Sequence, residues 1–265
     1  MNSKATTAAT SAPDLESRLL GRIEELGSVA IAFSGGVDSS VLLHAAKRAL
    51  GERAVAVIAD SPSLPRHELA EAKQLADSMN VRLRVVRTDE MDNADYVANR
   101  GDRCFFCKWA LFDAMQVVAD KEDLQFLAFG EITDDLNDDR PGARAAKQRG
   151  VVAPLREVGY SKQDVRDYAA RYSLSVAAKP ASACLASRIP VGTSVSREGL
   201  ELVERAERSI AELGFKVLRV RNHAPKARLE VGATEFDSAI AKKSEIEDRL
   251  LDLGFNEVEL AKYGE

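Results

Sequence analysis

Short apolar runs alternate with longer helical patterns over the first half of the chain, and this alternation limits the possible folds more than any other feature. The apolar runs are Val29 to Phe33, Ala54 to Ala59, Val81 to Val86 and Phe126 to Phe129. Each run has the length of a buried strand. The rhythm predicts an α/β fold, a parallel sheet with helices on both faces that binds its ligands at the carboxyl ends of the strands.

The first of these strands is followed directly by Ser34-Gly35-Gly36-Val37-Asp38-Ser39, and an apolar helix pattern comes next. Two adjacent glycines allow a tight turn that aims backbone N–H groups at an anion, and the helix N-terminus adds a favourable dipole. Ser34 and Ser39 can donate hydrogen bonds, whereas Asp38 would repel a phosphate unless Mg²⁺ lies between them. The alternative is a simple turn with a helix cap. The lysine of a Walker A loop is missing.

The last third of the chain has a different pattern. An irregular stretch from Ala177 to Ser196 separates it from a helix that we expect at Ser161 to Tyr172, with Ser161 as the N-cap and Asp164 three residues later. With Thr193 to Val195 as a possible leading strand, the pattern predicts a small α+β unit of the split βαβ kind. The expected elements are helix Arg197 to Leu213, strand Phe215 to Asn222, strand Lys226 to Val231, helix Thr234 to Leu253 and strand Asn256 to Leu260.

These patterns predict a disordered arm over residues 1–12, a first domain over 13–180 and a C-terminal domain over 181–265. The net charge of -5, with 30% charged and 45% hydrophobic residues, is ordinary for a globular protein and too acidic for broad nucleic-acid binding. The chain has neither a secretory h-region at its start nor a stretch of membrane-spanning length. Three cysteines, an odd number, suit a reducing compartment. We therefore expect a cytoplasmic protein without membrane or nucleic-acid partners. A homo-oligomer is a separate expectation.

The cysteines form a second candidate site. Cys104 and Cys107 make a CxxC pair between Arg103 and Lys108, two cations that favour thiolates, and Cys184 lies in an irregular segment with Arg188 nearby. Three soft ligands can hold a [4Fe-4S] cluster by three of its irons and leave the fourth open. Zinc would need a fourth ligand, and no histidine has a short ligand spacing from a cysteine. A redox disulfide, or burial as small apolar side chains, also remains open.

In its strand–helix context the hexamer resembles the signature of the PP-loop ATP pyrophosphatases, a fold family that includes GMP synthetase, NAD synthetase and the tRNA thiolases. The resemblance implies that ATP, with Mg²⁺, loses pyrophosphate at this loop while its AMP part passes to a substrate oxygen. It also implies an adenosine site at Asp60 and Ser61, with Arg66 and Lys162 near the nucleotide. The alternative for Lys162 is a solvated residue in the first turn of a helix.

Six segments resemble, in this order, the LarE family of sulfur transferases: Ala30 to Ser40, Ala59 to Leu69, Arg103 to Lys108, Asp134 to Gly142, Pro180 to Thr193 and Arg219 to Val231. LarE proteins act on pyridinium-3,5-biscarboxylic acid mononucleotide and mature the nickel-pincer nucleotide cofactor of lactate racemase. The resemblance implies a catalytic set of Asp38, Cys104, Cys107 and Cys184. In single-cysteine members the cysteine that matches Cys184 gives up its own sulfur. The two additional cysteines here resemble the branch in which a [4Fe-4S] cluster carries an extra sulfide.

The substrate is expected at the C-terminal domain. Arg219 and Arg221 alternate on a predicted strand, so both guanidinium groups emerge on one face, and Glu230 follows on the next strand. The resemblance implies that these residues, with Arg188, receive the mononucleotide, and that sulfide or another donor supplies the sulfur. The alternative is a solvated strand face. Two other functions remain open, a tRNA thiolase of the PP-loop class and a non-catalytic module that senses nucleotide or redox state.

Overall fold

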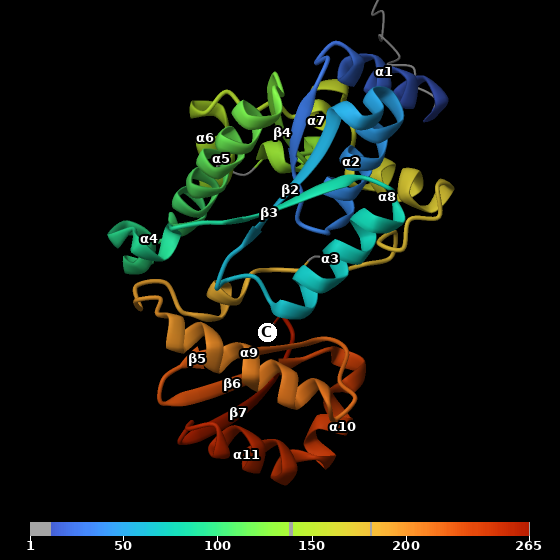
Figure 1. Ribbon diagram of the computed structural model, residues 1–265. Helices are drawn as coiled ribbons and strands as arrows, with labels where there is room; N and C mark the ends of the chain where they lie inside the picture. The colour runs from blue at the N-terminus through green and yellow to red at the C-terminus, as the bar shows by residue number, and fades with distance from the viewer. Residues whose placement is uncertain (1–11, 138–139, 181, 265) are drawn as a thin grey trace, which may run out of the picture. The chain divides into compact units, whose positions relative to one another are not determined.

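The computed structural model describes residues 12–137, 140–180 and 182–264, which form two compact units (Figure 1). Within these residues the first unit comprises the chain up to Asp60, His67–Thr88 and the part from Lys108 to 180. The second comprises Ser61–Arg66, Asp89–Cys107 and the part from Ser182 onward. Because the units alternate along the sequence, the linear division at residue 180 stays a prediction. The predicted arm of residues 1–12 lies outside the described residues except for Ala12, where α1 begins.

A parallel sheet of four strands, in the order β3-β2-β1-β4, forms the centre of the described part of the first unit. Both β2 and β4 pair with β1, whose four residues are all buried, and β3 pairs with β2 at one edge. This arrangement confirms the predicted α/β class. The strands are β1 (Val29–Ala32), β2 (Ala54–Asp60), β3 (Arg82–Arg87) and β4 (Phe126–Phe129).

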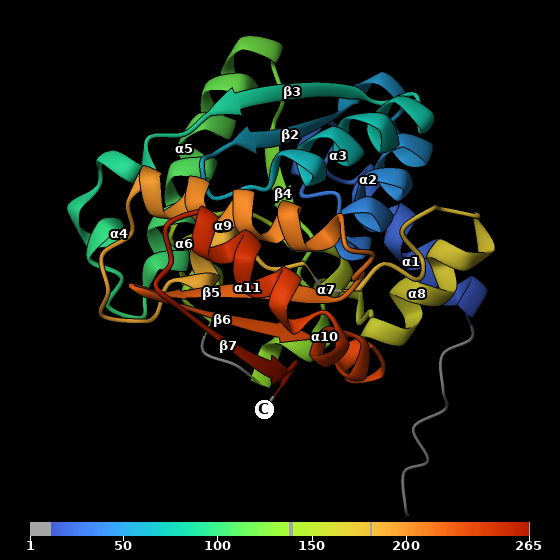
Figure 2. The same cartoon turned by 90° about the horizontal axis from the view of Figure 1, so that it is seen from below.

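Helices cover both faces of this sheet, as Figures 1 and 2 show. On one side lie α5 (Arg103–Glu122) and α6 (Pro141–Gln148). The other side is covered by α1 (Ala12–Glu24), α2 (Val37–Leu50), α3 (Arg66–Ser78) and α8 (Lys162–Arg171). The shorter helical elements of the chain are η1 (Gly51–Arg53), η2 (Glu90–Asp92), α4 (Ala94–Ala98), η3 (Thr133–Asn137), α7 (Pro154–Val158), η4 (Leu185–Arg188) and η5 (Ala233–Glu235).

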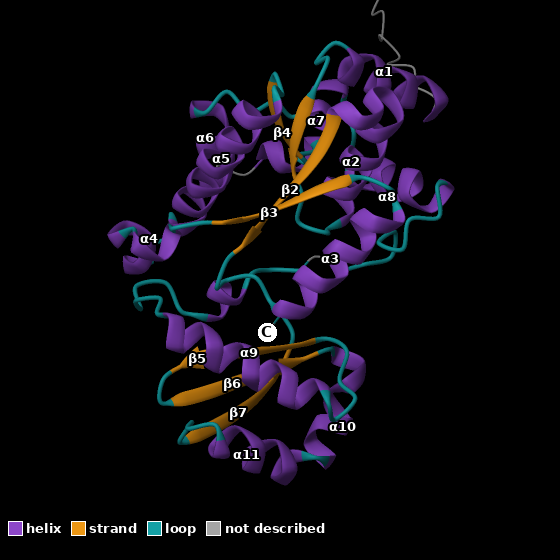
Figure 3. Cartoon of the chain, viewed as in Figure 1, coloured by secondary structure: helices purple, strands orange, loops and turns teal. Residues whose placement is uncertain are grey.

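The second unit contains a smaller mixed sheet, β5-β6-β7, drawn in orange with its helices in purple in Figure 3. Its β5 and β6 are antiparallel, whereas β6 and β7 are parallel. Side chains such as Ile210, Leu229 and Leu250 form one buried core between the sheet and its helices. The elements are α9 (Arg197–Ala211), β5 (Leu218–His223), β6 (Lys226–Val231), α10 (Phe236–Ala241), α11 (Lys243–Asp252) and β7 (Glu257–Lys262).

Two expectations for this unit were wrong. Thr193 to Val195 is not a strand, because its backbone groups bond to other loop segments: the Val195 N–H donates to the Val97 carbonyl (2.9 Å) and the Thr193 carbonyl accepts from Asn99 Nδ2 (3.0 Å). The helix expected at Thr234 to Leu253 is divided at Lys242, whose ammonium donates to the Leu213 carbonyl (2.7 Å). Among the described helices, none is both long enough and apolar enough to cross a membrane.

Candidate active site

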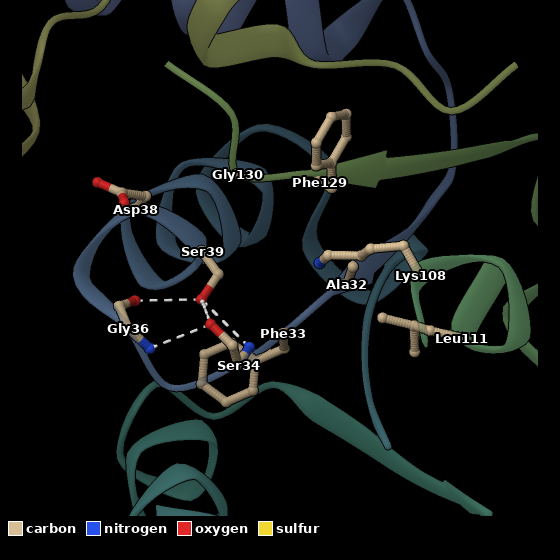
Figure 4. Close-up of a pocket in the computed structure, with 10 residues that line it drawn as sticks. All are labelled: Ala32, Phe33, Ser34, Gly36, Asp38, Ser39, Lys108, Leu111, Phe129 and Gly130. Atoms are coloured by element: carbon tan, nitrogen blue, oxygen red, sulfur yellow. Dashed lines mark hydrogen bonds between the residues drawn. The ribbon is translucent and has the colours of Figure 1, made fainter. Parts of the chain in front are cut away.

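The loop Ser34 to Ser39 connects β1 to α2 and is held by its own groups. Ser39 Oγ accepts a hydrogen bond from the Ser34 backbone N–H (3.2 Å) and donates one to the Gly36 carbonyl (3.1 Å). The two serine hydroxyls are 3.1 Å apart, and the Gly36 N–H lies 3.4 Å from Ser34 Oγ. Figure 4 shows these bonds closing the loop beside the N-terminus of α2. The loop is therefore ordered before a ligand arrives, which lowers the entropy cost of binding.

Backbone geometry makes the N-terminus of α2 available to an anion. Gly36 is the N-cap and has no side chain to accept hydrogen bonds from the first N–H groups of the helix. Gly35 has φ +70°, and a Cβ atom there would lie 2.9 Å from the Ala72 Cβ. A Cβ atom on Gly130, at the end of β4, would lie 2.7 Å from the Ser39 backbone nitrogen. Both positions therefore require glycine.

Asp38, in the first turn of α2, faces Lys162, the first residue of α8. The lysine Nζ is 2.8 Å from each of the two carboxylate oxygens. Ser161 and Asp164 form the capping box that starts α8, which confirms the predicted helix start. The Lys162 backbone N–H also donates to Asp134 (2.9 Å). The predicted nucleotide lysine thus lies at the phosphate loop, and its contact with the nucleotide stays a prediction.

A small pocket of about 120 Å³ opens beside the loop. Figure 4 shows Lys108 extending from α5 toward β1 and the loop, with its ammonium group inside the pocket. Besides the loop residues Ser34, Gly36, Asp38 and Ser39, the lining consists of Ala32, Phe33, Lys108, Leu111, Phe129 and Gly130.

Sequence reasoning missed Lys108 and Gly130 as pocket residues. It treated Lys108 as a cation beside the CxxC pair, and nothing in the local pattern separates this lysine from any other on α5. Gly130 could have been predicted from the sequence, because it follows the strand β4 directly and parallel strands place their carboxyl ends at one edge of the sheet. Glu131 comes next: burial raises the pKa of its carboxyl group, while Arg156, 2.5 Å away, and Lys108 act in the opposite direction.

The predicted adenosine site follows β2. Asp60 is the last residue of β2, which pairs with β1 in the sheet. Ser61 is buried, and its hydroxyl donates to Glu90. Arg66 begins α3, and its guanidinium donates to the carbonyls of Ser61 and Leu64, both at 2.6 Å. Asp60, Ser61 and Arg66 are not among the residues that line the pocket, and their contacts with the nucleotide stay predictions.

No group of three or more His, Cys, Asp or Glu side chains comes close enough to hold a metal ion within the described part of the chain. Mg²⁺ does not need such a group, because proteins usually bind it through one or two carboxylates together with substrate phosphates and water. The Asp38 carboxylate and the hydroxyls of Ser34 and Ser39 offer hard oxygen ligands of this kind. The residues at the loop therefore fit Mg²⁺ that arrives with ATP.

The three cysteines all lie in the second unit, and none of them forms a disulfide. Cys104 and Cys107 are three residues apart on α5, which places them on one side of the helix. Cys104 is exposed, while Cys107 and Cys184 are half-buried and pack against one buried cluster that includes Tyr96 and Leu185. The thiols are suitable ligands for an iron–sulfur cluster. This structure does not gather them into one ligand group.

Asn99 joins the two chain segments that carry the cysteines. Its side chain is 1% exposed, and its Nδ2 donates to the carbonyls of Pro190 (2.8 Å) and Thr193 (3.0 Å). Its Oδ1 accepts from Arg103, the neighbour of Cys104, at 2.6 Å. The Asn99 backbone, at φ +51°, accepts from the Gly192 N–H (2.8 Å). Asparagine suits this position because it tolerates the left-handed conformation and offers both donors and an acceptor.

Tyr96 forms a second link in the same unit. Its ring is 1% exposed, and its hydroxyl hydrogen-bonds to the Ser63 side chain. The Ser63 carbonyl accepts from the Leu185 N–H (2.8 Å), next to Cys184. Burial raises the pKa of Tyr96, and the nearby Cys107 and Cys184 add to that rise. Tyr96 and Asn99 were not predicted, because the side-chain partner of Tyr96 is 33 residues away in the sequence and the carbonyl partners of Asn99 are 90 or more residues away.

The predicted substrate arginines lie in this unit as well. On β5, Arg219 and Arg221 alternate with the buried Val220, so both emerge on the sheet face opposite the core. Arg221 is paired with Glu230, at 3.0 and 3.1 Å. Arg188, on η4, is buried. It donates to the Cys184 carbonyl (3.1 Å), and its guanidinium is paired with Glu207 at 2.8 and 3.2 Å.

Arg219 differs from these two. Its guanidinium stacks on the Tyr263 ring, 4.5 Å from the ring centre, and no carboxylate of the described residues forms an ion pair with it. Burial lowers the pKa of Arg219, and the charges of Arg188 and Arg221 lower it further. A partly desolvated cation among like charges gains most from an added anion. The group formed by Arg188, Arg219, Arg221 and Glu230 is called the arginine cluster below.

The parallel sheet, the loop after its central strand and the pocket beside that loop define a nucleotide-binding domain of the PP-loop class. Residues 17–100, which contain β1, the loop, β2 and β3, match the NAD synthase family. The chain belongs to the LarE family of this class. It is 30% identical over 243 residues to the pyridinium-3,5-bisthiocarboxylic acid mononucleotide synthase of Lactiplantibacillus plantarum, with 91% of this chain and 88% of the relative covered.

Two further relatives are uncharacterised proteins. One, from a Synechocystis species, is 42% identical over 207 residues, which are 78% of this chain and 77% of the relative. The other, from Methanocaldococcus jannaschii, is 27% identical over 233 residues, 87% of each chain. Membership of the LarE family confirms the predicted family and the class of ATP-using enzyme. The iron–sulfur branch stays a prediction.

Proposed function

We propose that this protein adenylylates a carboxylate of pyridinium-3,5-biscarboxylic acid mononucleotide with ATP and replaces it with a thiocarboxylate. The reaction would serve the biosynthesis of the nickel-pincer nucleotide cofactor of lactate racemase. Similarity to a synthase of the corresponding bisthiocarboxylic acid mononucleotide over 91% of the chain supports this substrate. The odd number of cysteines supports an enzyme that works in the cytoplasm.

The first half of the reaction belongs to the nucleotide pocket. A substrate carboxylate oxygen attacks the α-phosphorus of ATP, the bond to the bridging oxygen breaks, and pyrophosphate leaves with Mg²⁺. The N–H groups at the start of α2 and the ammonium of Lys108, both at the pocket, would stabilise the negative charge that develops on the leaving group. Asp38 would hold Mg²⁺ against the phosphates. Because the loop is closed by its own hydrogen bonds, its donors need little reorganisation when the charge moves.

The second half belongs to the residues around Cys184. Sulfur at the oxidation level of sulfide attacks the acyl carbon, and the bond from that carbon to the oxygen of AMP breaks. AMP leaves with one oxygen of the original carboxylate, and no electrons are exchanged. An oxygen of a free carboxylate is a poor leaving group, whereas the AMP of the acyl-adenylate is a good one, so the protein needs no separate base for this step. Sulfide or another sulfur donor then restores the sulfur.

The arginine cluster is the observation that carries the substrate assignment. A mononucleotide brings a phosphate dianion, and Arg219 is a partly buried cation without a carboxylate partner among the described residues. A guanidinium can bind a phosphate through two parallel hydrogen bonds. Arg188 connects this cluster to the sulfur-bearing residue, because it donates to the Cys184 carbonyl. A phosphate on Arg219 would thus be held in the unit that also carries Cys184.

We also propose that Cys104, Cys107 and Cys184 hold a [4Fe-4S] cluster. All three lie in one compact unit, and two of them pack against the same buried cluster. Such a cluster would supply an open iron that can carry an extra sulfide, so that the enzyme turns over repeatedly. Cys184 as a sacrificial sulfur donor is the second candidate, because the described residues contain no ready group of three metal ligands.

Anaerobic purification followed by iron and sulfide analysis tests the cluster. We expect four irons and at least four sulfides per chain, and several product molecules per enzyme. Cys104→Ala should lower the iron content and restrict the enzyme to one turnover. If this variant keeps full iron and multiple turnovers, the three-cysteine proposal is wrong. Conversion of Cys184 to dehydroalanine in the wild type, seen as a loss of mass, would support the sacrificial route instead.

Assays with the mononucleotide separate the proposed enzyme from its rivals. Formation of AMP and of a thiocarboxylate product, both dependent on the mononucleotide, supports the proposal. AMP formation that depends on tRNA would identify a tRNA thiolase, for which the net charge of -5 is unfavourable. Binding of ATP without AMP formation under any of these conditions would identify a sensing module.

A further inference from the structure

The ion pair between Lys162 and Asp38 occupies the point at which the loop would need a metal. The ammonium is 2.8 Å from both carboxylate oxygens, so it covers the two atoms that a divalent cation would use. A lysine ammonium and Mg²⁺ are both positive, so they repel each other and compete for these two oxygens. Asp38 therefore has two competing states, one with the ammonium and one with the metal.

The position of Lys162 is set by the start of α8. Its backbone N–H donates to Asp134 (2.9 Å), and the capping box of Ser161 and Asp164 fixes the preceding turn. The side chain beyond the backbone is free to turn about four carbon–carbon bonds. The lysine can therefore leave Asp38 without any change in α8, and a phosphate that enters the pocket offers it a second anionic partner.

Both members of the pair remain in contact with solvent. The Lys162 side chain is 36% exposed and the Asp38 side chain 27%. Ion pairs with this exposure are weak, because water screens the charges and each group is partly solvated when they separate. The pair is therefore strong enough to compete with a weakly bound metal and weak enough to open when ATP brings additional charge.

From this geometry we propose that Lys162 occupies the metal position on Asp38 in the nucleotide-free enzyme and yields it to Mg²⁺ only when ATP enters. Once ATP is bound, the ammonium moves to a phosphate oxygen and Mg²⁺ takes the carboxylate. The metal is thereby admitted together with its phosphates and is excluded without them. This inference rests on the proposed use of ATP and Mg²⁺, and it assigns to Lys162 a second role as a positioning residue for Asp38.

Binding of Mn²⁺, a paramagnetic substitute for Mg²⁺, tests the exchange in the absence of nucleotide. Electron paramagnetic resonance measures free Mn²⁺ in titrations of the full-length protein. Lys162→Met should lower the dissociation constant of Mn²⁺ by up to about fivefold, which corresponds to the loss of a competing ion pair of about 1 kcal/mol. The same variant should weaken the binding of Mg·ATP, so its two effects have opposite signs. A variant that is merely unfolded would weaken both.

Matched variants isolate the pair. Lys47→Met removes another lysine of the same unit that is paired with a carboxylate, Glu52, away from the pocket, and should leave Mn²⁺ binding unchanged. Lys162→Arg keeps a positive charge next to the Asp38 carboxylate and should keep Mn²⁺ binding weak. The double variant Asp38→Asn with Lys162→Met should lose the increase in Mn²⁺ affinity that Lys162→Met shows alone.

The proposal is overturned if Lys162→Met binds Mn²⁺ no more tightly than the wild type, or if the gain persists without the Asp38 carboxylate. This failure differs from a failure of the proposed function. The chain has one tryptophan, Trp109, which follows the pocket residue Lys108 on α5, so its fluorescence can follow the binding of ATP to the wild type. ATP binding with no change in Mn²⁺ affinity would refute the exchange alone, whereas the absence of ATP binding would refute the proposed function.

Discussion

The nucleotide pocket and the cysteine-bearing region are built in different ways. The phosphate loop is one continuous hexamer, closed by hydrogen bonds between residues at most five positions apart. The cysteine-bearing region joins three separate stretches of the chain through buried side chains, among them Asn99 and Tyr96. A local site depends on backbone geometry, which a short motif can encode. An assembled site depends on side chains that fit together only in the folded protein.

The largest expected effect separates the chemistry of the two regions. Cys184→Ala should lower thiocarboxylate formation at least about 10³-fold, because it removes the sulfur-bearing group. The nucleotide pocket remains intact, so ATP should still be cleaved when hydroxylamine traps the acyl-adenylate. AMP and product are measured by liquid chromatography in the same reactions. Asp38→Ala should reduce the formation of both AMP and thiocarboxylate. If Cys184→Ala also loses AMP formation, the assignment of ATP cleavage and sulfur transfer to separate regions is wrong.

The second effect tests the backbone fit of the pocket. Gly130→Val should raise the dissociation constant of ATP about a hundredfold, because the new side chain must displace the backbone of Ser39, 2.7 Å from the added Cβ atom. Titration followed by Trp109 fluorescence measures this constant. The alkylation rate of the cysteines should not change. Gly21→Ala on α1, where an added Cβ atom has no neighbour within 4 Å, is the control and should bind ATP normally.

The third effect tests the assembled region. Asn99→Ala should lower the free energy of unfolding by about 2–3 kcal/mol, because it leaves buried carbonyl groups such as that of Thr193 without a donor. Urea denaturation measures this loss, and iodoacetamide should react faster with Cys184 because its segment is held less firmly. The exposed Asn80, also at positive φ (50°), provides the control. If Asn80→Ala costs as much, the backbone conformation and not the hydrogen bonds explains the loss.

The smallest effect concerns the helices behind the phosphate loop. His44 on α2 is 3.0 Å from the Tyr168 hydroxyl on α8, and burial, with the charge of Arg48, lowers its pKa below the ordinary value of 6.5. The unfolded chain therefore binds more protons than the folded one as the pH falls below about 6.5, so stability decreases there. The free energy of unfolding should fall by less than about 1 kcal/mol between pH 7 and pH 5.5. This loss is smaller than the free energy that corresponds to a shift of one pKa unit.

Thermal or urea unfolding of His44→Gln tests this prediction. The variant should lack that part of the pH dependence which the wild type shows below about pH 6.5. Glu16 contributes to the pH dependence in both proteins: burial raises its pKa, but hydrogen bonds from Tyr172 and Arg48 and the nearby charges lower it overall. The difference between the two curves therefore isolates His44. Identical curves would show that His44 does not couple protonation to folding.

The same contrast explains what the sequence could predict. The parallel sheet and the phosphate loop follow from patterns of a few residues, and the Ser161 capping box was predicted from two residues three positions apart. The strand expected at Thr193 to Val195 was wrong because its backbone groups bond to residues about 95 positions earlier, Val97 and Asn99. The division of the second helix at Lys242 likewise depends on a tertiary contact with Leu213.

The candidate site residues show the same contrast between a local motif and contacts that only the fold creates. Ser34, Gly36, Asp38 and Ser39 were predicted together and line one pocket. Lys108 joins them from α5, and only the fold brings it there, since its sequence neighbours are the cysteines. In the arginine cluster, the alternation on β5 could be predicted from the sequence. The pairing of Arg188 with Glu207 and the stacking of Arg219 on Tyr263 could not. Long-range partners of charged side chains have no local signal.

The most direct test of the central claim follows one oxygen atom. The claim is that ATP activates the same carboxylate that later receives sulfur. If the mononucleotide carries ¹⁸O in both oxygens of its carboxylates, each AMP formed should contain one ¹⁸O atom, and each thiocarboxylate should retain one. Mass spectrometry of AMP and of the mononucleotide product measures both. Product formation with unlabelled AMP would contradict the account, because the carboxylate oxygen would then not have attacked the α-phosphorus.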